Sequence, residues 1–163
     1  APGETAEQLE PRMAQLGVKA ISSALQTLEA WDGQTEIGMP QDTKQASRAP
    51  RLKKQDGLID WSQTAEQIFN QVRAFQPWPG SFSQWQGAQR KPLRVILHQV
   101  ACVESSGGCP GEIVVAEPGQ LVVQAGQGGL EILSLQPAGK REMEAEAFLR
   151  GYQPQTGDRF GAF

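Results

Sequence analysis

The sequence predicts a mainly β protein with flanking helices, in which a long helix precedes a five-stranded β-barrel of the OB type. Three observations support this fold class. Short aliphatic and β-branched segments, separated by Gly and Pro turns, follow one another from Phe82 to Leu135, as in small barrels. An apolar stripe at helical spacing runs through the first part of the chain. The length of 163 residues suits one barrel domain with an appendage.

The first helix is predicted from apolar residues three or four positions apart. They are Leu9, Met13, Leu16, Ala20, Ala24 and Leu28. Pro11 has no backbone N–H, so we expect the helix to kink there or to begin there. Gly17 lies within the stripe and predicts close packing against another element.

A linker is predicted next, because residues 34–60 have no sustained hydrophobic period and contain Gly38, Pro40 and Pro50. Its prolines favour an extended, semi-stiff connector. The predicted organisation is therefore a terminal helical part at 1–33, this linker, and a barrel domain at 61–163.

A second helix is expected after Trp61, with Ser62 as its N-cap and Pro77 beyond its end. The period then changes to that of strands. The expected strands are 82–85, 93–103, 112–116, 121–125 and 130–135. A short helix over 144–149 is expected to end at Gly151.

Composition excludes several classes of function. The apolar runs are far shorter than the roughly 20 residues of a membrane span. The acidic first residues do not fit a signal peptide. A single histidine makes a His-built metal site improbable. Without a secretory signal, Cys102 and Cys109 are expected to be free thiols. The missing initiator Met suggests a piece of a longer chain.

The net charge of −3 conceals an asymmetry. Residues 1–42 contain two basic and seven acidic side chains, whereas residues 43–163 contain 13 basic and 11 acidic ones. The chain is therefore not a wholly basic nucleic-acid binder, but its second part allows a basic face. Gly126, Gly128 and Gly129 precede a strand instead of a helix, which argues against a phosphate-binding loop.

Several stretches resemble the C-terminal half of the methionyl-tRNA formyltransferase family. They are 49–57 (APRLKKQDG) with 59–61 (IDW), 72–80 (VRAFQPWPG), 133–143 (LSLQPAGKREM), 148–151 (FLRG) and 157–160 (GDRF). The first helix looks like the last helix of the family's catalytic domain. Arg48 stands in place of a usual aromatic residue, Arg51 in place of Lys, and Gln76 in place of Asn.

The resemblance implies an enzyme that transfers a formyl group from 10-formyltetrahydrofolate to the amino group of methionyl-initiator tRNA, for translation initiation. It also implies that the catalytic Asn, His and Asp lie in a Rossmann-like domain upstream of this chain. We therefore expect a fragment that begins with a helix of a truncated α/β catalytic domain, has no catalytic residues, cofactor or metal, and is inactive alone. The implied partners are initiator methionyl-tRNA and the N-terminal catalytic domain, in a monomeric enzyme of the bacterial cytoplasm.

Basic residues without neighbouring acids are the candidates for tRNA contact, because lysine and arginine neutralise phosphates and release counterions. One group is in the linker and the others are on the second helix, at a strand entry and after a Pro-Ala-Gly turn. The candidate tRNA-binding residues are Lys44, Arg48, Arg51, Lys53, Lys54, Arg73, Arg90, Lys91, Arg94, Lys140 and Arg141.

Each candidate also has a plainer interpretation, as a solvated surface charge. The aromatic residues Trp61, Trp78, Phe82 and Trp85 could stack on bases, but packing is the favoured interpretation. Trp61 and Trp78 suit the junction where the second helix packs on the barrel, and His98 is predicted to be a barrel side chain. Two other functions stay open. One is the C-terminal domain of a related formyltransferase or formyltetrahydrofolate hydrolase that does not bind RNA. The other is a protein interaction module that uses the apolar stripe.

Overall fold

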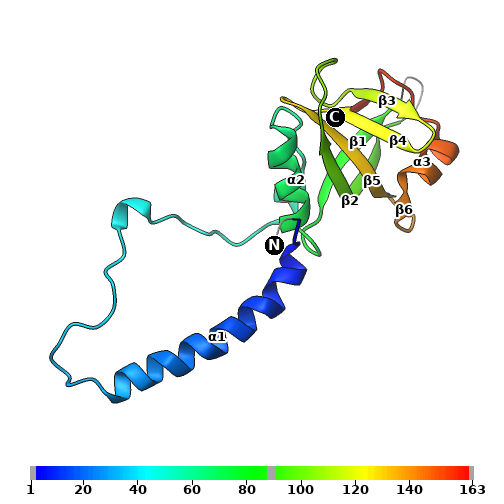
Figure 1. Cartoon of the computed structure of the whole chain (residues 1–163). Coiled ribbons are helices and arrows are strands. Elements are labelled where there is room, and N and C mark those ends of the chain that lie inside the picture. Colours follow the sequence, from blue (N-terminus) through cyan, green and yellow to red (C-terminus); the bar gives the residue numbers. More distant parts are fainter. Residues whose placement is uncertain (1–2, 88–90, 162–163) are drawn as a thin grey trace. The chain divides into compact units, whose positions relative to one another are not determined.

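The computed structural model describes residues 3–87 and 91–161, and the chain divides into two compact units (Figure 1). One unit contains the N-terminal residues through Ala6 together with the chain from Lys53 onward. The other is Glu7–Leu52. Each unit is described by itself.

The Glu7–Leu52 unit contains most of α1 (Ala6–Glu29) and the short 3₁₀ helix η1 (Thr43–Gln45). Helix α1 continues through Pro11 and does not begin there. A side chain added at Gly17 would meet nothing within 4 Å, so the close packing predicted at Gly17 is not made with the described residues of this chain. In η1, the carboxylate of Asp42 caps the first turn by accepting a hydrogen bond from the Lys44 N–H, at 2.9 Å.

The larger unit is built on one antiparallel sheet, with strand order β3-β4-β5-β2-β1-β7 and with β6 paired to β5. The strands are β1 (Ser81–Gln86), β2 (Leu93–Val103), β3 (Ile113–Glu117), β4 (Gln120–Gln124), β5 (Gly129–Pro137), β6 (Met143–Glu144) and β7 (Arg159–Gly161). The five predicted strands correspond to β1–β5. The mainly β fold class with flanking helices is therefore confirmed.

The two ends of this strand order are joined by backbone hydrogen bonds. The Phe160 N–H donates to the Gly111 carbonyl at 2.7 Å, and the Ile113 N–H donates to the Asp158 carbonyl at 2.8 Å. The short strand β7 thus connects β1 to the start of β3, which curls the sheet into a barrel-like form. The two-residue β6 and the three-residue β7 were not among the predicted strands.

Helix α2 (Ala65–Ala74) begins two residues later than predicted, and its N-cap is Thr64. The Thr64 hydroxyl accepts from the Gln67 N–H, while the Gln67 side chain accepts from the Thr64 N–H, which makes a capping box. Ser62 was wrongly predicted as the cap. Its hydroxyl donates instead to the Asp60 carboxylate at 2.7 Å. Buried Ile68 and the rest of its apolar face pack α2 on β2 and β5.

Helix α3 (Ala145–Tyr152) lies on the opposite side of the sheet from α2 (Figure 1). It contains Gly151, ends at Tyr152 and is capped by Gln153, whose positive φ of 51° is the left-handed conformation common at helix C-termini. The predicted end at Gly151 was thus too early. Phe148 of α3 is fully buried and contacts Trp85 edge to face, with ring centroids 5.4 Å apart. This pair closes the core on the α3 side.

Candidate nucleic-acid interface

One face of the sheet carries polar and basic side chains. The register places Ile96 of β2 opposite Phe82 of β1 and opposite Gln136 of β5, so these three side chains share a face. Arg94 lies two residues before Ile96 and therefore shares this face. The β2–β5 register is irregular between Leu97 and Gln99, and His98 is assigned to the face by its ring Nε2, which lies 3.2 Å from the Gln136 side-chain oxygen. All five are half-buried, whereas their neighbours along the strands are mostly buried in the core. We call these five residues the outer face.

Arg94 is held in a defined position on the outer face. Its guanidinium carbon lies 3.8 Å from the centroid of the Phe82 ring. Its Nε is buried and has no hydrogen-bond partner among the described residues. Arginine stacked on an aromatic ring loses little further freedom when it binds, and its planar fork matches phosphate oxygens. Arg94 therefore combines a fixed position with chemistry suited to an anion.

The loop between β5 and β6 brings two more cations to Arg94. The Ala138 N–H donates to the Arg94 carbonyl at 2.8 Å, which fixes the start of this loop beside the start of β2. Lys140 and Arg141 are exposed on this loop, and exposed Lys91 precedes β2. The backbone contact thus places four of the predicted residues, Lys91, Arg94, Lys140 and Arg141, at the same end of β2 and β5. We call these four the basic cluster.

A polar network lies beside the basic cluster. The Ser134 hydroxyl donates to one Glu142 carboxylate oxygen at 2.8 Å, and the other oxygen lies 4.0 Å from Nδ1 of His98. Nε2 of His98 is 3.2 Å from the Gln136 side-chain oxygen, and the Gln136 amide donates to the Lys140 carbonyl at 2.8 Å. The prediction that His98 is a barrel side chain is confirmed, but its link to this loop was not predicted.

Arg73 has a different environment from the basic cluster. Its Nε donates to the Asn70 side chain at 2.8 Å, and a terminal nitrogen donates to the Glu4 carbonyl at 3.1 Å. The guanidinium also lies 5.9 Å from the centroid of the Phe69 ring. These contacts give Arg73 a role in holding residues 3–6 against α2, and they leave it fewer donors for a ligand.

The linker cations fall into both units. Lys44, Arg48 and Arg51 belong to the Glu7–Leu52 unit, whereas Lys53 and Lys54 belong to the unit that contains the sheet. All five are exposed. Lys54 opens the short 3₁₀ helix η2 (Lys54–Gly57), where the Asp56 carboxylate accepts from the Lys53 N–H at 2.7 Å. Arg90, also a predicted contact, lies outside the described residues.

The aromatic residues divide into packed and exposed ones. Trp61 is buried, and its indole N–H donates to the Ser83 hydroxyl at 3.0 Å. Trp85 is buried as well, so packing is confirmed for both tryptophans. Trp78 is 55% exposed, and the prediction that it packs is wrong there. Phe82 is the platform for Arg94, a role that was not predicted.

Other chemistry has little support in the described residues. No group of three or more His, Cys, Asp or Glu side chains within 3–87 and 91–161 is arranged to hold a metal ion. Partial burial and the nearby Glu66 carboxylate raise the pKa of the Cys102 thiol, which disfavours a reactive thiolate. Among the helices described, none has the length and apolarity needed to cross a bilayer.

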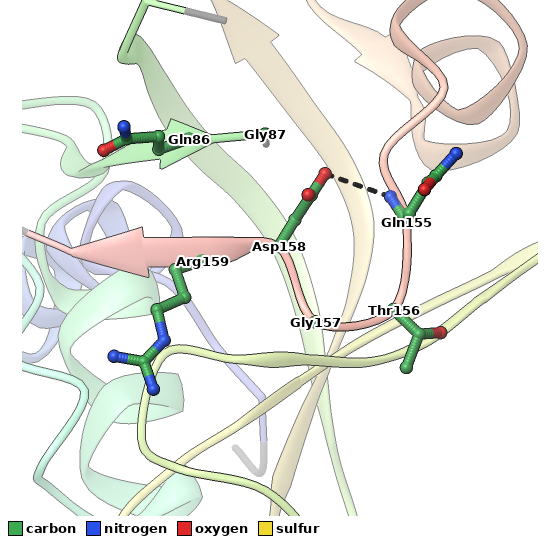
Figure 2. A pocket seen from close by; sticks show the side chains of 7 residues that line it. All are labelled: Gln86, Gly87, Gln155, Thr156, Gly157, Asp158 and Arg159. Carbon is green, nitrogen blue, oxygen red and sulfur yellow. Dashed lines mark hydrogen bonds between the residues drawn. The ribbon is translucent and has the colours of Figure 1, made fainter. Parts of the chain in front are cut away.

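A surface pocket of about 430 Å³ lies between the end of β1 and the turn before β7. Figure 2 shows that the Asp158 carboxylate points toward Gln155, whose backbone N–H it accepts at 3.0 Å. The Arg159 guanidinium points away from this carboxylate. The charged groups do not converge on one point, so the pocket lacks the arrangement typical of a small-molecule site.

Proteins similar to this chain carry formyltransferase names. Methionyl-tRNA formyltransferases of Koribacter versatilis and Carboxydothermus hydrogenoformans are 38% and 39% identical to it, over 99% and 96% of the chain. The enzyme of Magnetococcus marinus is 43% identical over 69% of the chain. The chain spans 49% and 48% of the first two relatives, which is about half their length.

Solved structures and a family model also match this chain. HypX from Aquifex aeolicus matches with a TM-score of 0.54 at 20% identity, over 83% of this chain and 23% of HypX, and this likeness concerns the fold alone. The model described as formyl transferase, C-terminal domain, matches residues 51–153. That range contains β1–β6, α2, the outer face and the basic cluster. The chain therefore belongs to the family of formyl transferase C-terminal domains.

Proposed function

We propose that this chain is the C-terminal, tRNA-binding part of a methionyl-tRNA formyltransferase. In this proposal an N-terminal catalytic domain transfers a formyl group from 10-formyltetrahydrofolate to methionyl-initiator tRNA, for translation initiation in the cytoplasm. The names of the relatives support the enzyme, and the half-length match supports the C-terminal position. The observation that carries the RNA-binding role is that the Ala138–Arg94 backbone hydrogen bond brings the loop of Lys140 and Arg141 to the start of β2, where Arg94 lies over the Phe82 ring.

The proposed binding is mainly to the phosphate backbone. Four cations at one end of β2 and β5 would neutralise phosphates and release counterions, which gives affinity without sequence preference. Exposed Trp78 offers a further apolar surface. These phosphate contacts would hold the tRNA so that its 3′ end reaches the catalytic domain. The reaction would then gain from positioning, since bound reactants avoid an entropic cost.

The linker cations are proposed as a second, more adaptable contact. Lys53 and Lys54 are exposed, and the hydrogen bond that caps η2 uses the Lys53 backbone. Their charges can therefore be changed without removing that cap. Together with Arg51 they form an acid-free run that can follow a phosphate backbone.

Filter binding of labelled tRNA to the 163-residue chain, over a salt series, tests the proposal. The variants are K140E/R141E on the loop and R51E/K53E/K54E in the linker. The control is K19E/R150E, which reverses two exposed charges on α1 and α3. Each test variant should weaken binding by about tenfold or more and flatten the salt dependence. Binding equal to that of the control across the salt series would contradict the proposal.

A further inference from the structure

The loop that carries Lys140 and Arg141 contains an acid that electrostatics alone would disfavour there. Glu142 follows both cations directly and is exposed. A carboxylate at this position lowers the local positive potential and should repel an RNA phosphate. A physical reason for its presence lies in its contacts, because the Glu142 carboxylate contacts Ser134 and His98, which are on strands of the sheet.

We propose that Glu142 and His98 are positioning residues, which fix the Lys140–Arg141 loop beside Arg94 so that the basic cluster is formed before RNA binds. This inference rests on the proposed function, since it concerns the same surface. It assigns a role to Glu142 and His98, although neither the negative charge of Glu142 nor the imidazole ring of His98 would by itself suggest RNA contact.

The first support is the bond between Glu142 and Ser134. Ser134 on β5 is 1% exposed, and its hydroxyl donates to the Glu142 carboxylate at 2.8 Å. A buried hydroxyl that loses its partner keeps its desolvation cost, which makes this bond unfavourable to break. Glu142 is thereby tied to the sheet at the far end of the loop.

The second support is the link through His98. Its Nδ1 lies 4.0 Å from the Glu142 carboxylate, and its Nε2 lies 3.2 Å from the Gln136 side-chain oxygen. Gln136 in turn donates to the Lys140 carbonyl at 2.8 Å. The imidazole therefore stands between two side chains that each reach the loop. With the Ala138–Arg94 backbone bond, the loop is held at its start, middle and end.

Holding the loop in place should strengthen tRNA binding, because the loop is then already ordered before the tRNA binds. A loop that must be ordered on binding loses conformational entropy at that moment, which reduces the affinity. Arg94 is already held by Phe82 at 3.8 Å. Fixing Lys140 and Arg141 beside it makes the whole basic cluster pre-organised.

The matched pair E142A and E142Q separates positioning from charge. Both variants remove one negative charge, so electrostatics predicts that both strengthen RNA binding equally. The glutamine oxygen can still accept from Ser134, whereas alanine cannot. Positioning therefore predicts that E142A binds tRNA about fivefold more weakly than E142Q. E117A, which removes an exposed acid on β3, is the charge control and should bind at least as well as the unchanged chain.

Hydrogen exchange of the loop amides gives a readout that needs no RNA. The amides of residues 138–142 should exchange about tenfold faster in E142A and H98A than in E142Q, while core amides of β5 keep their protection. The inference is overturned if E142A and E142Q exchange alike in the loop, or if they exchange differently but bind tRNA equally. If the unchanged chain itself binds no tRNA at low salt, the proposed function fails. The positioning role is then decided by hydrogen exchange alone: faster exchange of the loop amides in E142A than in E142Q supports it, and equal exchange overturns it.

Discussion

The guanidinium of Arg94 on β2 lies over the Phe82 ring of the neighbouring strand β1, 3.8 Å from its centroid. The two residues are diagonal neighbours, because Phe82 is paired with Ile96 and Arg94 with Gln84. This contact holds a cation whose Nε is already buried. Arg94 is thus the one member of the basic cluster whose position is set by an aromatic platform in the described structure.

Replacing Arg94 should therefore affect RNA binding more than replacing a mobile cation does. We expect R94A to weaken tRNA binding about fivefold to tenfold and to reduce the salt slope by about one. F82L keeps the charge but removes the ring, and should weaken binding about twofold to threefold. R150A, on α3, is the matched control and should bind normally. Equal binding by R94A and R150A in filter assays would contradict this role.

Gly126 is a second position where the structure makes a sharp prediction. A Cβ built there would lie 1.9 Å from the Ser62 carbonyl oxygen, and the Gly126 N–H donates to the Gln63 carbonyl at 2.8 Å. The turn after β4 thus supports the segment that leads into α2. Any side chain must push this segment away, and backbone atoms cannot move as freely as the end of a side chain.

We expect G126A to lower the free energy of unfolding by about 2 kcal/mol or more. G107A is the control, because an added Cβ there meets nothing within 4 Å and its φ is not in the left-handed region. Urea denaturation of both variants checks the difference. Similar midpoints for G126A and G107A would show that the turn adapts without cost.

The four cations of the basic cluster could be predicted from the sequence, but the contacts that position them could not. The alternation along β2 places Arg94 and His98 on one face, and the Pro-Ala-Gly turn places Lys140 and Arg141 in a loop. Phe82 could not be assigned as a platform, because its position beside Arg94 depends on the register between β1 and β2. Register reflects packing across the whole sheet, which a local pattern does not contain.

The missed elements of the fold have a similar physical explanation. β7 has three residues, too few to display a period, and is defined by pairing with β1 and with the start of β3. Residue type alone favours Ser62 over Thr64 as the cap of α2, because serine ranks above threonine at the N-cap position. The choice between them is made by Asp60, which binds the Ser62 hydroxyl, and by Gln67, which completes the capping box at Thr64.

Asp60 offers a prediction about pH. The Ser62 hydroxyl, then the Gln63 side-chain amide, then the Ser62 N–H donate to its carboxylate and lower its pKa below 3.8. A carboxyl whose pKa is lower in the folded state binds fewer protons there. It therefore stabilises the fold above its ordinary pKa, and this contribution is lost as the pH falls through the lowered value.

S62A should raise the pKa of Asp60, because it removes the largest cause of the lowering. Carbon-13 NMR titration of the side-chain carboxyl measures this directly. S106A, at an exposed serine elsewhere in the chain, should leave the Asp60 titration midpoint unchanged. If S62A and S106A give the same midpoint, the hydroxyl contact does not control the carboxyl.

Phe148 tests whether stability and RNA binding are separable. It is fully buried, contacts Trp85 edge to face with centroids 5.4 Å apart, and stacks on Tyr152 at 4.7 Å. F148A should lower the free energy of unfolding by about 3–5 kcal/mol, because it leaves a cavity between α3 and the sheet. F148L fills much of that space and should cost less. Below the unfolding temperature both variants should bind tRNA normally, since the basic cluster lies on other elements. A loss of binding by folded F148L, with the β5 amides still protected, would mean that packing under α3 controls the binding surface.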